Sequence, residues 1–411
     1  MIRLAFMTDP SRVIGARDAE ANAARFPLLP SALKGVMETL YKSAHVVVGA
    51  DSIGPWQDRT DTTVYALTRD AERRFEAAHI RPTRDVSELI ERFADSDEEL
   101  LIAGGRTVLG LFLDHAERID VAETDSDVPG DLVFADWDTP RFVLESSEPW
   151  DGGRTLHLVR RGVRLRNGIA LYEEGIRDGQ PDVVRRYTGA RYTQHSTGVP
   201  DGTDGFLEFF TEFLQRNTTR DIRVLRAVED GRYAFVHVAQ ELNGGAARWI
   251  TMDLFDTDAD GKIVEHWDVI QAWTDESQVT GESRVDLSEP TERNKAVVRT
   301  MMNEVFIYGD ITRIGEFVAE DVVVHQPGLG SGLQPWRDQL AAEFARGTRY
   351  DFVFRLIGQG NFVVTFSRVK GADGGRATFE VFRLADGRVV EVWSTAEPIP
   401  TPEEARNVGK F

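Results

Sequence analysis

The residues best suited to acid–base chemistry lie in the segment KIVEHWDVIQ, residues 262–271. In an extended strand, alternate side chains point to the same face. His266 and Asp268 therefore share a face with the aliphatic residues Val264 and Ile270. An imidazole and a carboxylate in such an apolar wall can remove a proton next to a carbonyl group, once burial has tuned their pKa.

Two further residues join this set of candidates. Asp253 lies on the preceding predicted strand, and His195 ends a strand before the turn GVPDG. We predict His195, Asp253, His266 and Asp268 as catalytic residues. Structural roles remain open, because a histidine on a strand is commonly a satisfied structural residue and His266 with Asp268 can form a hydrogen-bonded pair at a rim. His195, His266 and Asp268 could also form a metal-ligand set, but nothing else in the sequence supports one and no metal is predicted.

The composition is that of a folded, acidic protein. The 411 residues are 41% hydrophobic and 28% charged, which predicts two to four globular domains. The net charge of -20 repels nucleic acid and anionic lipid, so neither is an expected partner. Cysteine is absent, which excludes disulfides and thiolate metal sites. No stretch resembles a membrane helix or a signal peptide, so we expect a cytoplasmic location.

Residues 1–162 alternate between predicted strands and helices. The strands include HVVVGA, TVYALT and ELLIAGG, and the helices include SALKGVMETLYKS and VSELIERFA. This alternation predicts a largely parallel sheet with helices on its faces. Near the end, two runs of period 2 flank Asp151-Gly152-Gly153, which predicts a hairpin.

The rest of the chain contains an internal repeat. His195 corresponds to His325 and Trp267 to Trp393, with nearly the same spacing. Each copy opens with a helix and closes with long alternating strands, which predicts helices against a curved antiparallel sheet. We assign the copies to residues 163–273 and 294–411. The acidic stretch 274–293 has almost no apolar residues and is predicted to be a linker.

The N-terminal motifs resemble a known family. VIGARDA, LPSALKGVMETL, HVVVGADSIG, YALTRD, LLIAGGRTVLGLFL and TDSDVPGDLVF occur in the order and spacing of the dihydrofolate reductase family. The resemblance covers residues 1–162. It implies that the pyrophosphate of a dinucleotide lies at a glycine-rich strand end, against the N-termini of helices with free N–H groups.

This resemblance implies a set of cofactor-binding residues: Gly49, Ser52, Thr68, Arg69, Ala103, Gly104, Gly105, Arg106 and Thr107. Thr68 and Arg69 match the positions that approach a ribose 2′-phosphate, which favours NADPH as the cofactor. Arg59 lies near the position that binds a substrate carboxylate in the family.

Two residues depart from the family pattern. Ala32 occupies the position of the usual carboxylic acid, and Asp51 would oppose a phosphate in the second phosphate-binding turn. A reductase with a different substrate and a cofactor-binding shell without turnover both remain open.

The repeated domains resemble a second family. QHSTGVPDGTDGFLEFF and DGKIVEHWDVIQ are similar to the SnoaL-like polyketide cyclase family, within the nuclear transport factor 2-like superfamily. The second copy resembles it more weakly. The resemblance implies a conical α+β barrel with a deep apolar pocket, whose mouth His195 would occupy. It also implies pairing of the two cones within one chain, and a homo-oligomer remains open.

The sequence therefore predicts an α/β dihydrofolate-reductase-like domain plus two tandem α+β cone-shaped (SnoaL-like) domains. The leading hypothesis is an NADPH-dependent reductase fused to a cone pair that acts on or binds a small carbonyl compound. The alternatives are an isomerase, cyclase or aldolase-type enzyme with an inactive reductase-like domain, and a non-catalytic small-molecule-binding protein.

The two copies differ where chemistry would occur. Glu380, Val392 and Ser394 replace Asp253, His266 and Asp268 respectively. We therefore expect only the first copy to be equipped for acid–base work, and the second to be a degenerate copy.

Overall fold

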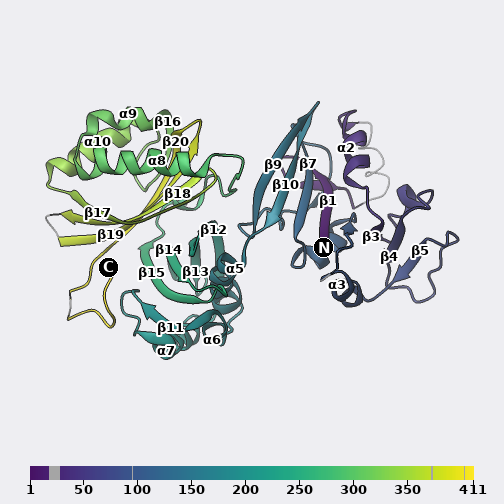
Figure 1. Ribbon diagram of the computed structural model, residues 1–411, viewed down its shortest axis with the longest axis horizontal. Coiled ribbons are helices and arrows are strands. Elements are labelled where there is room, and N and C mark those ends of the chain that lie inside the picture. The colour runs from purple at the N-terminus through teal and green to yellow at the C-terminus, as the bar shows by residue number, and fades with distance from the viewer. Residues whose placement is uncertain (18–27, 95, 372–373, 402) are drawn as a thin grey trace. The chain divides into compact units, whose positions relative to one another are not determined.

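The chain divides into two compact units in a computed structural model, which describes all residues except 18–27, 95, 372–373 and 402. The first unit comprises residues 1–138 and 142–160, and the second comprises residues 139–141 and 161–411. Figure 1 shows the elements of both units.

The first unit is an α/β domain built on strands that alternate with helices along the chain. Its strands are β1 (Ile2–Thr8), β2 (Val13–Gly15), β3 (His45–Gly49), β4 (Thr63–Leu67), β5 (Ile80–Thr83), β6 (Leu100–Ile102), β7 (Arg118–Thr124), β8 (Leu132–Val133), β9 (Phe142–Trp150) and β10 (Gly153–Arg160). Its helices are η2 (Gly54–Trp56), α2 (Leu33–Leu40), α3 (Val86–Ala94) and α4 (Arg106–Leu113).

Eight of these strands form one mixed sheet in the order β5-β4-β3-β6-β1-β7-β10-β9. The strands from β5 to β7 are parallel, and β10 and β9 are the predicted antiparallel hairpin. Alternate residues of β3 serve both faces of the sheet. Val46 and Val48 join the core that contains α2, whereas Val47 joins the core that contains α3 and α4. The predicted architecture of a largely parallel sheet with helices on both faces is therefore confirmed.

The second unit contains two similar sets of elements. The first set is α5 (Val163–Ala170), the π-helical η3 (Leu171–Arg177), α6 (Val183–Tyr187), β11 (Thr188–Gln194), α7 (Gly202–Arg216), β12 (Arg220–Asp230), β13 (Tyr233–Leu242), β14 (Ala247–Thr257) and β15 (Ile263–Ala272). The second set is α8 (Thr291–Met301), the π-helical η5 (Met302–Ile307), η6 (Ile311–Arg313), α9 (Ile314–Phe317), β16 (Val318–His325), α10 (Leu333–Ala345), β17 (Arg349–Gln359), β18 (Phe362–Gly371), β19 (Gly374–Ala385) and β20 (Arg388–Pro398). We call these sets the first cone and the second cone.

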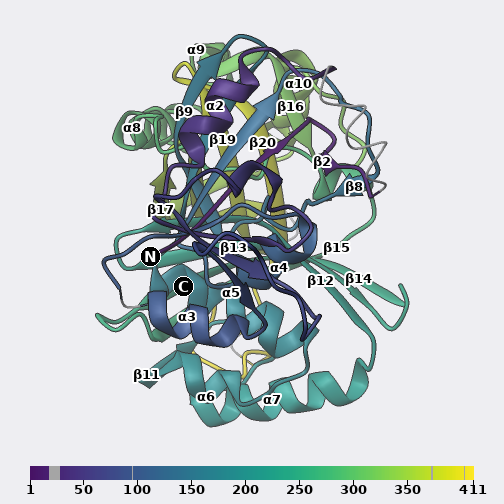
Figure 2. The ribbon, with the colours of Figure 1, turned by 90° about the vertical axis from the view of Figure 1, so that its right-hand side faces the viewer.

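Each cone has one five-stranded sheet, and the two sheets have the same topology. Their orders are β11-β15-β14-β13-β12 and β16-β20-β19-β18-β17. In each sheet the first pair is parallel and the other pairs are antiparallel. Helices α8, α9 and α10 cover one face of the second sheet (Figure 1), and α6 lies beside α7 in the first cone (Figure 2). The predicted duplication of an α+β cone is confirmed.

The face of each sheet that turns away from its own helices carries aromatic residues. The rings of Phe235 and Phe379, one from each cone, lie 5.6 Å apart, and Trp267 lies 5.6 Å from Phe354. We propose that these contacts represent the pairing of the two cones within one chain.

The acidic segment between the cones makes contacts that its composition does not predict. It contains the short helix η4 (Glu276–Val279), and Val285 is buried. The buried Arg226 of the first cone donates to the carbonyl of Glu282, at 2.8 Å, while Trp393 of the second cone donates to the carbonyl of Thr280, at 3.0 Å. The acceptors in these contacts are backbone carbonyls, so the side-chain composition of the segment could not predict them. Within the described residues, no helix is both long and apolar enough to cross a membrane.

Residues 163–280, expressed alone, are expected to self-associate or aggregate, because removal of the second cone exposes Phe235 and Trp267 to water. Light scattering coupled to size-exclusion chromatography measures this. A fragment that contains both cones, residues 163–411, is the matched control and is expected to stay soluble. A stable, soluble monomer of the shorter fragment would contradict the proposed pairing.

Candidate functional site

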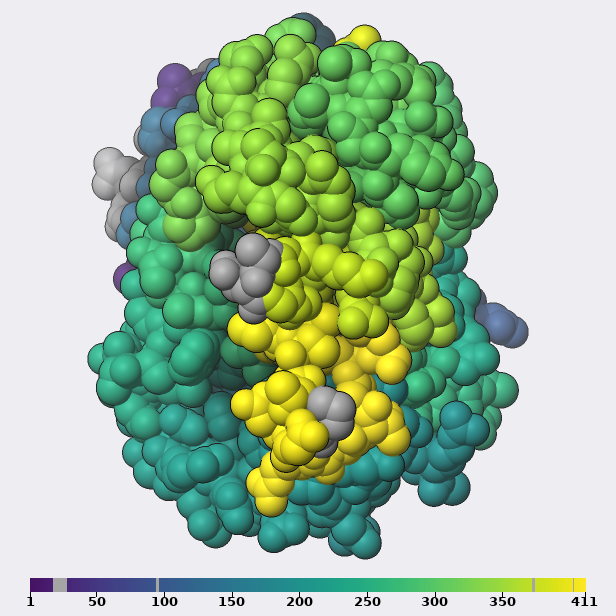
Figure 3. All heavy atoms as spheres, turned by 90° about the vertical axis from the view of Figure 1, so that its left-hand side faces the viewer, coloured from purple at the N-terminus to yellow at the C-terminus, as the bar shows by residue number. Residues whose placement is uncertain are grey.

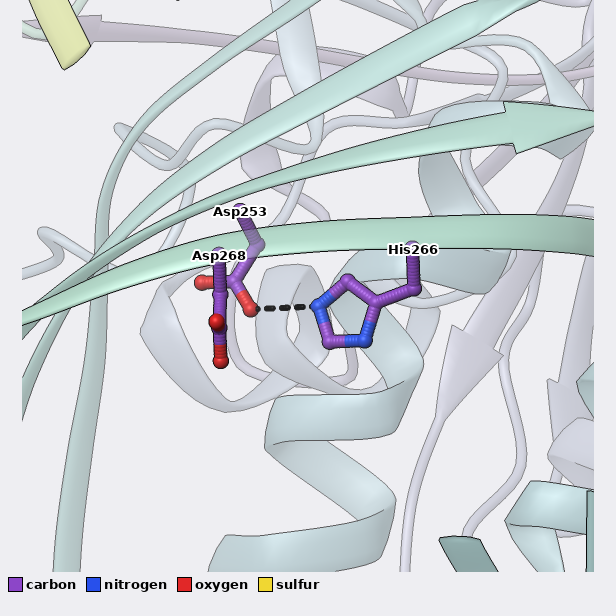
Figure 4. Close-up of side chains that lie close together, drawn as sticks. All are labelled: Asp253, His266 and Asp268. Atoms are coloured by element: carbon purple, nitrogen blue, oxygen red, sulfur yellow. Dashed lines mark hydrogen bonds and ion pairs between the residues drawn. The ribbon is translucent and has the colours of Figure 1, made fainter. Parts of the chain in front are cut away.

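Three of the predicted catalytic residues converge on one face of the first sheet. The antiparallel register of β14 and β15 pairs Asp253 with Asp268 and Phe255 with His266. All three polar side chains are buried, and His266 Nε2 lies 2.9 Å from Asp253 Oδ1 (Figure 4). The predicted sharing of a strand face thus brings Asp253, His266 and Asp268 together, and we call these residues the trio.

The imidazole of His266 is held from both of its nitrogens. Tyr192 Oη lies 3.2 Å from Nδ1, and Gln194 donates to that tyrosine oxygen at 2.9 Å. The ring of Phe255 stacks on the imidazole, with 4.7 Å between centroids. Burial raises the pKa of Tyr192 well above its usual value, so the phenol stays neutral and acts as a hydrogen-bonding group.

The two carboxyls of the trio have different electrostatic environments. Burial raises the pKa of Asp253, and the hydrogen bond and charge of His266 offset only part of this rise. Burial also acts to raise the pKa of Asp268, but the ammonium of Lys410 and the charge of His266 outweigh it and lower the pKa. Asp268 Oδ2 also accepts a hydrogen bond from Ser196 Oγ at 2.5 Å. The trio therefore pairs an ionised carboxylate with a His–Asp couple that can hold a proton.

Lys410 comes from the last five residues of the sequence, which we call the C-terminal strap (residues 407–411). Its ammonium donates to Asp268 Oδ1 at 2.9 Å and to the carbonyl of Asp268 at 2.8 Å, and it also contacts Glu397. The lysine side chain is fully buried. Sequence reasoning missed Lys410, because its partners are far away along the chain and no periodicity marks the strap.

The rest of the strap lies over the first cone and reaches the second. Asn407 donates to the carbonyls of Ser196 and Val199, at 2.6 and 2.9 Å. The ring of Phe411 packs on Phe366 of the second cone, with 5.0 Å between centroids. Figure 3 shows the end of the chain, in yellow, across the teal surface of the first cone. The strap thus contacts the trio at Asp268 and the adjacent loop at Ser196 and Val199.

His195 does not join the trio. It stacks on Trp267, with 4.9 Å between ring centroids, and its Nε2 lies 3.0 Å from Glu265 Oε1. The residue that lies level with His266 is Gln194, one position earlier, because β11 pairs with β15 in that register. His195 therefore turns to the opposite face of the sheet.

The second cone repeats this arrangement around His195. His325 stacks on Trp393 with 4.5 Å between centroids, and its Nε2 lies 2.8 Å from Glu391 Oε1. The same histidine, stacked on a tryptophan and within hydrogen-bonding distance of a glutamate in both copies, on the face away from the trio, supports a structural role for His195.

The trio has a spacing at which one ligand atom from each residue could hold a metal ion, since these atoms lie within 4.8 Å of one another. However, His266 Nε2 is already hydrogen-bonded to Asp253, and the ammonium of Lys410 already neutralises the carboxylate of Asp268. A metal ion would have to displace that ammonium. The donor set does not fit a metal while Lys410 is in place.

The second cone has an open cavity at the position of the trio. The register pairs Glu380 with Ser394 and Phe382 with Val392, as expected from the repeat. The cavity of about 380 Å³ has both polar and aromatic walls: Gln271, Phe306, Val324, Gln326, Trp336, Gln339, Leu340, Glu343, Tyr350, Val369, Arg376, Thr378, Glu380, Val392, Ser394 and Ala396.

Glu380 is the buried acid of this cavity, and the comparison of the two copies undervalued it. Its carboxyl accepts hydrogen bonds from the hydroxyls of Tyr350 and Thr365, the latter at 2.6 Å. Burial raises the pKa of Glu380 to about 7, although these hydrogen bonds oppose the rise. The signal in the sequence was Thr365, which lies where the first copy has the apolar Val236 opposite its acid.

In the first unit, the residues predicted to bind a dinucleotide come from the carboxyl ends of three neighbouring strands. Strands β4, β3 and β6 are adjacent and parallel, and they end at Leu67, Gly49 and Ile102. The predicted residues lie at or just beyond these ends: Gly49, Ser52, Thr68, Arg69, Ala103, Gly104, Gly105, Arg106 and Thr107. The sheet therefore gathers them at one edge.

The glycine pair at this edge has two physical roles. A Cβ on Gly104 would come within 2.6 Å of Val108 Cβ, so only glycine lets α4 pack against the strand end. Among the residues that the structure describes, a Cβ on Gly105 would meet no atom within 4 Å. Gly105 is the N-cap of α4, and no side chain caps this helix. Its first N–H groups therefore face an open position that suits an anion.

Two other residues of the first unit were singled out from the sequence. Arg59 donates to the carbonyl of Tyr41 at 3.2 Å and lies over the ring of Trp56. Ala32 is the N-cap of α2, and no side chain caps that helix either. The helix start thus carries no carboxylate at the position where the family pattern has one.

The comparisons with known proteins agree with both resemblances. Residues 47–156 match the family model for dihydrofolate reductase, and residues 169–266 and 298–392 match the model for the SnoaL-like domain. The N-terminal resemblance and both C-terminal resemblances are confirmed. Among solved structures, a dihydrofolate reductase from Enterococcus faecalis complexed with NADP(H) and RAB-propyl is similar at 18% identity, with a TM-score of 0.32. That match covers 39% of this chain and 97% of the other. No curated protein matches the chain.

Replacement of Lys410 by Met is expected to destabilise the protein at pH 7.5. It leaves the buried Asp268 and the partly buried Glu397 without their shared cation, and loss of one partner of a buried ion pair costs about 3–5 kcal/mol. The loss should shrink as the pH falls and the two carboxyls become protonated. Urea denaturation at pH 7.5 and pH 5 measures this, and the exposed Lys34→Met is the control with little expected effect. Equal stability of Lys410→Met and wild type would contradict the buried pairing.

Glu380 is expected to make the wild type less stable as the pH rises. Its pKa is about 7 in the folded state against an ordinary value of 4.5, so the folded state binds more protons between these values. The free energy of unfolding should therefore fall by about 3 kcal/mol between pH 4.5 and pH 8 through this group alone. Thermal denaturation of wild type and Glu380→Gln across this range checks it. The advantage of the variant should grow with pH, and a constant difference would refute the assignment.

Proposed function

We propose that the chain is an NADPH-dependent reductase of the dihydrofolate reductase type, joined to a SnoaL-like cone pair that acts on or binds a small carbonyl compound. The observation that carries the reductase part is the gathering of glycines and strand ends at one edge of the first sheet. The observation that carries the cone part is the presence of buried titratable groups on the equivalent face of both cones.

The edge of the first sheet has the chemistry that a pyrophosphate needs. The uncapped N-terminus of α4 offers free N–H groups and the positive end of the helix dipole. Arg69 and Arg106 are exposed at the same edge. Asp51 carries an opposing charge, but its carboxylate lies 3.5 Å from the guanidinium of Arg73, which offsets part of it.

The chain itself must supply the groups that orient the substrate and deliver a proton. NADPH, when bound, supplies a hydride. Ala32 offers no proton at the N-cap of α2, so the proton that accompanies the hydride has to come from water or from another side chain. A substrate that differs from dihydrofolate is consistent with this replacement.

The replacement at Ala32 also favours a second candidate function. A reductase-like domain without its acid could be inactive, and the cones alone would then carry the activity as an isomerase, cyclase or aldolase-type enzyme. The trio supports this, because a His–Asp couple beside an ionised carboxylate can exchange a proton with a bound carbonyl compound.

The variant Gly105→Ala tests the cofactor edge. The added methyl group meets no protein atom within 4 Å and φ at this residue is -73°, so the fold should be kept. The methyl would stand between the helix N-terminus and a phosphate, and we expect the Kd for NADPH to rise by about tenfold or more. Titration with NADPH, followed by nucleotide fluorescence, measures this.

Gly110→Ala is the matched control for that test, because its methyl group also meets no protein atom and lies further along α4. Its Kd should equal that of the wild type. Arg69→Gln should reduce the preference for NADPH over NADH. Failure of the wild type to bind NADPH at millimolar concentration would remove the reductase proposal, and equal affinity of Gly105→Ala would remove this edge as the site.

A further inference from the structure

We propose that the reactive site of the cone pair lies in the second cone, where Glu380 acts as general base and acid on a compact carbonyl compound bound in the 380 Å³ cavity. This inference rests on the proposal that the cones act on a carbonyl compound. It goes further by naming the cone, the residue and the class of ligand, and it reverses the expectation drawn from the sequence of the two copies.

The cavity has the size of a site for a small ligand, since pockets that hold small molecules are typically about 300–1,000 Å³. Its walls are mixed: several are polar, and Glu343 and Arg376 are the charged groups that line it beside Glu380. The aromatic side chains of Phe306, Trp336 and Tyr350 form one part of the wall. Their rings pack on one another, with 5.0 Å between Phe306 and Tyr350 and 6.3 Å between Phe306 and Trp336. A compact ring system fits such a wall.

The cavity exists because side chains of the trio are shortened in the second copy. Val392 replaces the imidazole of His266, and Ser394 replaces the carboxylate of Asp268. Both replacements line the cavity. The remaining acid is retained as a glutamate, which is one methylene longer than Asp253. The second cone thus loses two charged or bulky groups but keeps a carboxyl at the wall of the space they vacate.

The carboxyl is held in one position. The hydroxyls of Tyr350 and Thr365 each donate to a different oxygen of Glu380. Tyr350 lines the cavity as Glu380 does, so this pair presents its polar atoms to a bound ligand. With a pKa of about 7, Glu380 populates both protonation states near neutral pH, which is the condition for efficient proton transfer.

In the first cone, most polar atoms of the trio already have partners, and the exception is Asp253 Oδ2, which is buried without a hydrogen-bond partner among the described residues. Asp268 is held by the Lys410 ammonium and by Ser196, and His266 is held by Asp253. The C-terminal strap lies over these groups. A ligand would have to break the buried ion pair to reach Asp268, whereas Glu380 can be reached through the cavity.

The reaction that this geometry supports is a balanced proton transfer. The ionised Glu380 takes a proton from the carbon next to the carbonyl group, and the electron pair of the broken C–H bond forms the C=C bond of an enolate. The protonated Glu380 then returns the proton to the same carbon or to another carbon of the conjugated system. The hydroxyls of Thr378 and Ser394 line the same cavity and can donate to the enolate oxygen. No co-reactant is needed.

The test uses the full chain and 2-tetralone, a compact bicyclic ketone with acidic hydrogens next to its carbonyl. Incorporation of deuterium from D₂O is followed by proton NMR. We expect the wild type to accelerate the exchange and Glu380→Gln to lose about 10²-fold or more of that acceleration. Thr365→Val removes a hydrogen bond that lowers the pKa of Glu380, so it should move the pH–rate profile to higher pH. Glu391→Gln, a matched change on the opposite face of β20, should exchange at the wild-type rate.

The outcomes separate this inference from the proposed function. If Asp253→Asn abolishes exchange while Glu380→Gln does not, the chemistry belongs to the first cone, and this inference fails while the carbonyl proposal stands. If the wild type neither binds 2-tetralone nor accelerates exchange, both the inference and the carbonyl proposal fail. The NADPH titration of Gly105→Ala is independent of either result.

Discussion

The pairing of Asp253 with Asp268 across β14 and β15 sets the conditions for the whole first cone. Two carboxyls buried side by side cannot both ionise unless positive charge compensates them. Without that charge, one of them keeps its proton. His266 compensates one of them, and Lys410 compensates the other. The contact between Lys410 and Asp268 requires the end of the chain to return across the first cone. This contact fixes the C-terminal strap and brings Phe411 against the second sheet. A local register thus determines contacts that are remote in sequence.

The second copy meets the same constraint by removing charge. With Ser394 opposite Glu380, the strand pair holds one carboxyl instead of two, while Glu343 and Arg376 also line the cavity. Two hydroxyls satisfy the remaining acid, and the volume of the lost side chains becomes a cavity. The duplication therefore holds one face on which an ion pair and hydrogen bonds hold the carboxyls, and one on which Glu380 adjoins an open cavity. Both copies keep the stacked histidine on the other face of the sheet.

The sequence predicted the fold and the trio, because both depend on local rules. Strand alternation in KIVEHWDVIQ assigned His266 and Asp268 to one face, and the order of six motifs indicated the N-terminal sheet. It did not predict which face of the sheet His195 occupies, because the register of the parallel pair β11 and β15 is set by tertiary packing. The sequence also could not predict the contact of Lys410 with Asp268 or the cavity of the second cone. The first depends on a contact across 142 positions, and the second depends on the combined volume of several side chains.

The two solutions give the cones opposite responses to pH. Asp268 has a lowered pKa, so its contribution to stability is present above the ordinary value of 3.8 and is lost as the pH falls below it. Glu380 has a raised pKa, so the folded state loses stability as the pH rises from 4.5 through about 7. The two groups together favour mildly acidic conditions for stability, whereas proton abstraction by Glu380 needs its ionised form and so gains from higher pH. Glu380 therefore lowers the stability of the second cone near neutral pH because its carboxyl is buried, and the same burial brings its pKa to the range that acid–base chemistry requires.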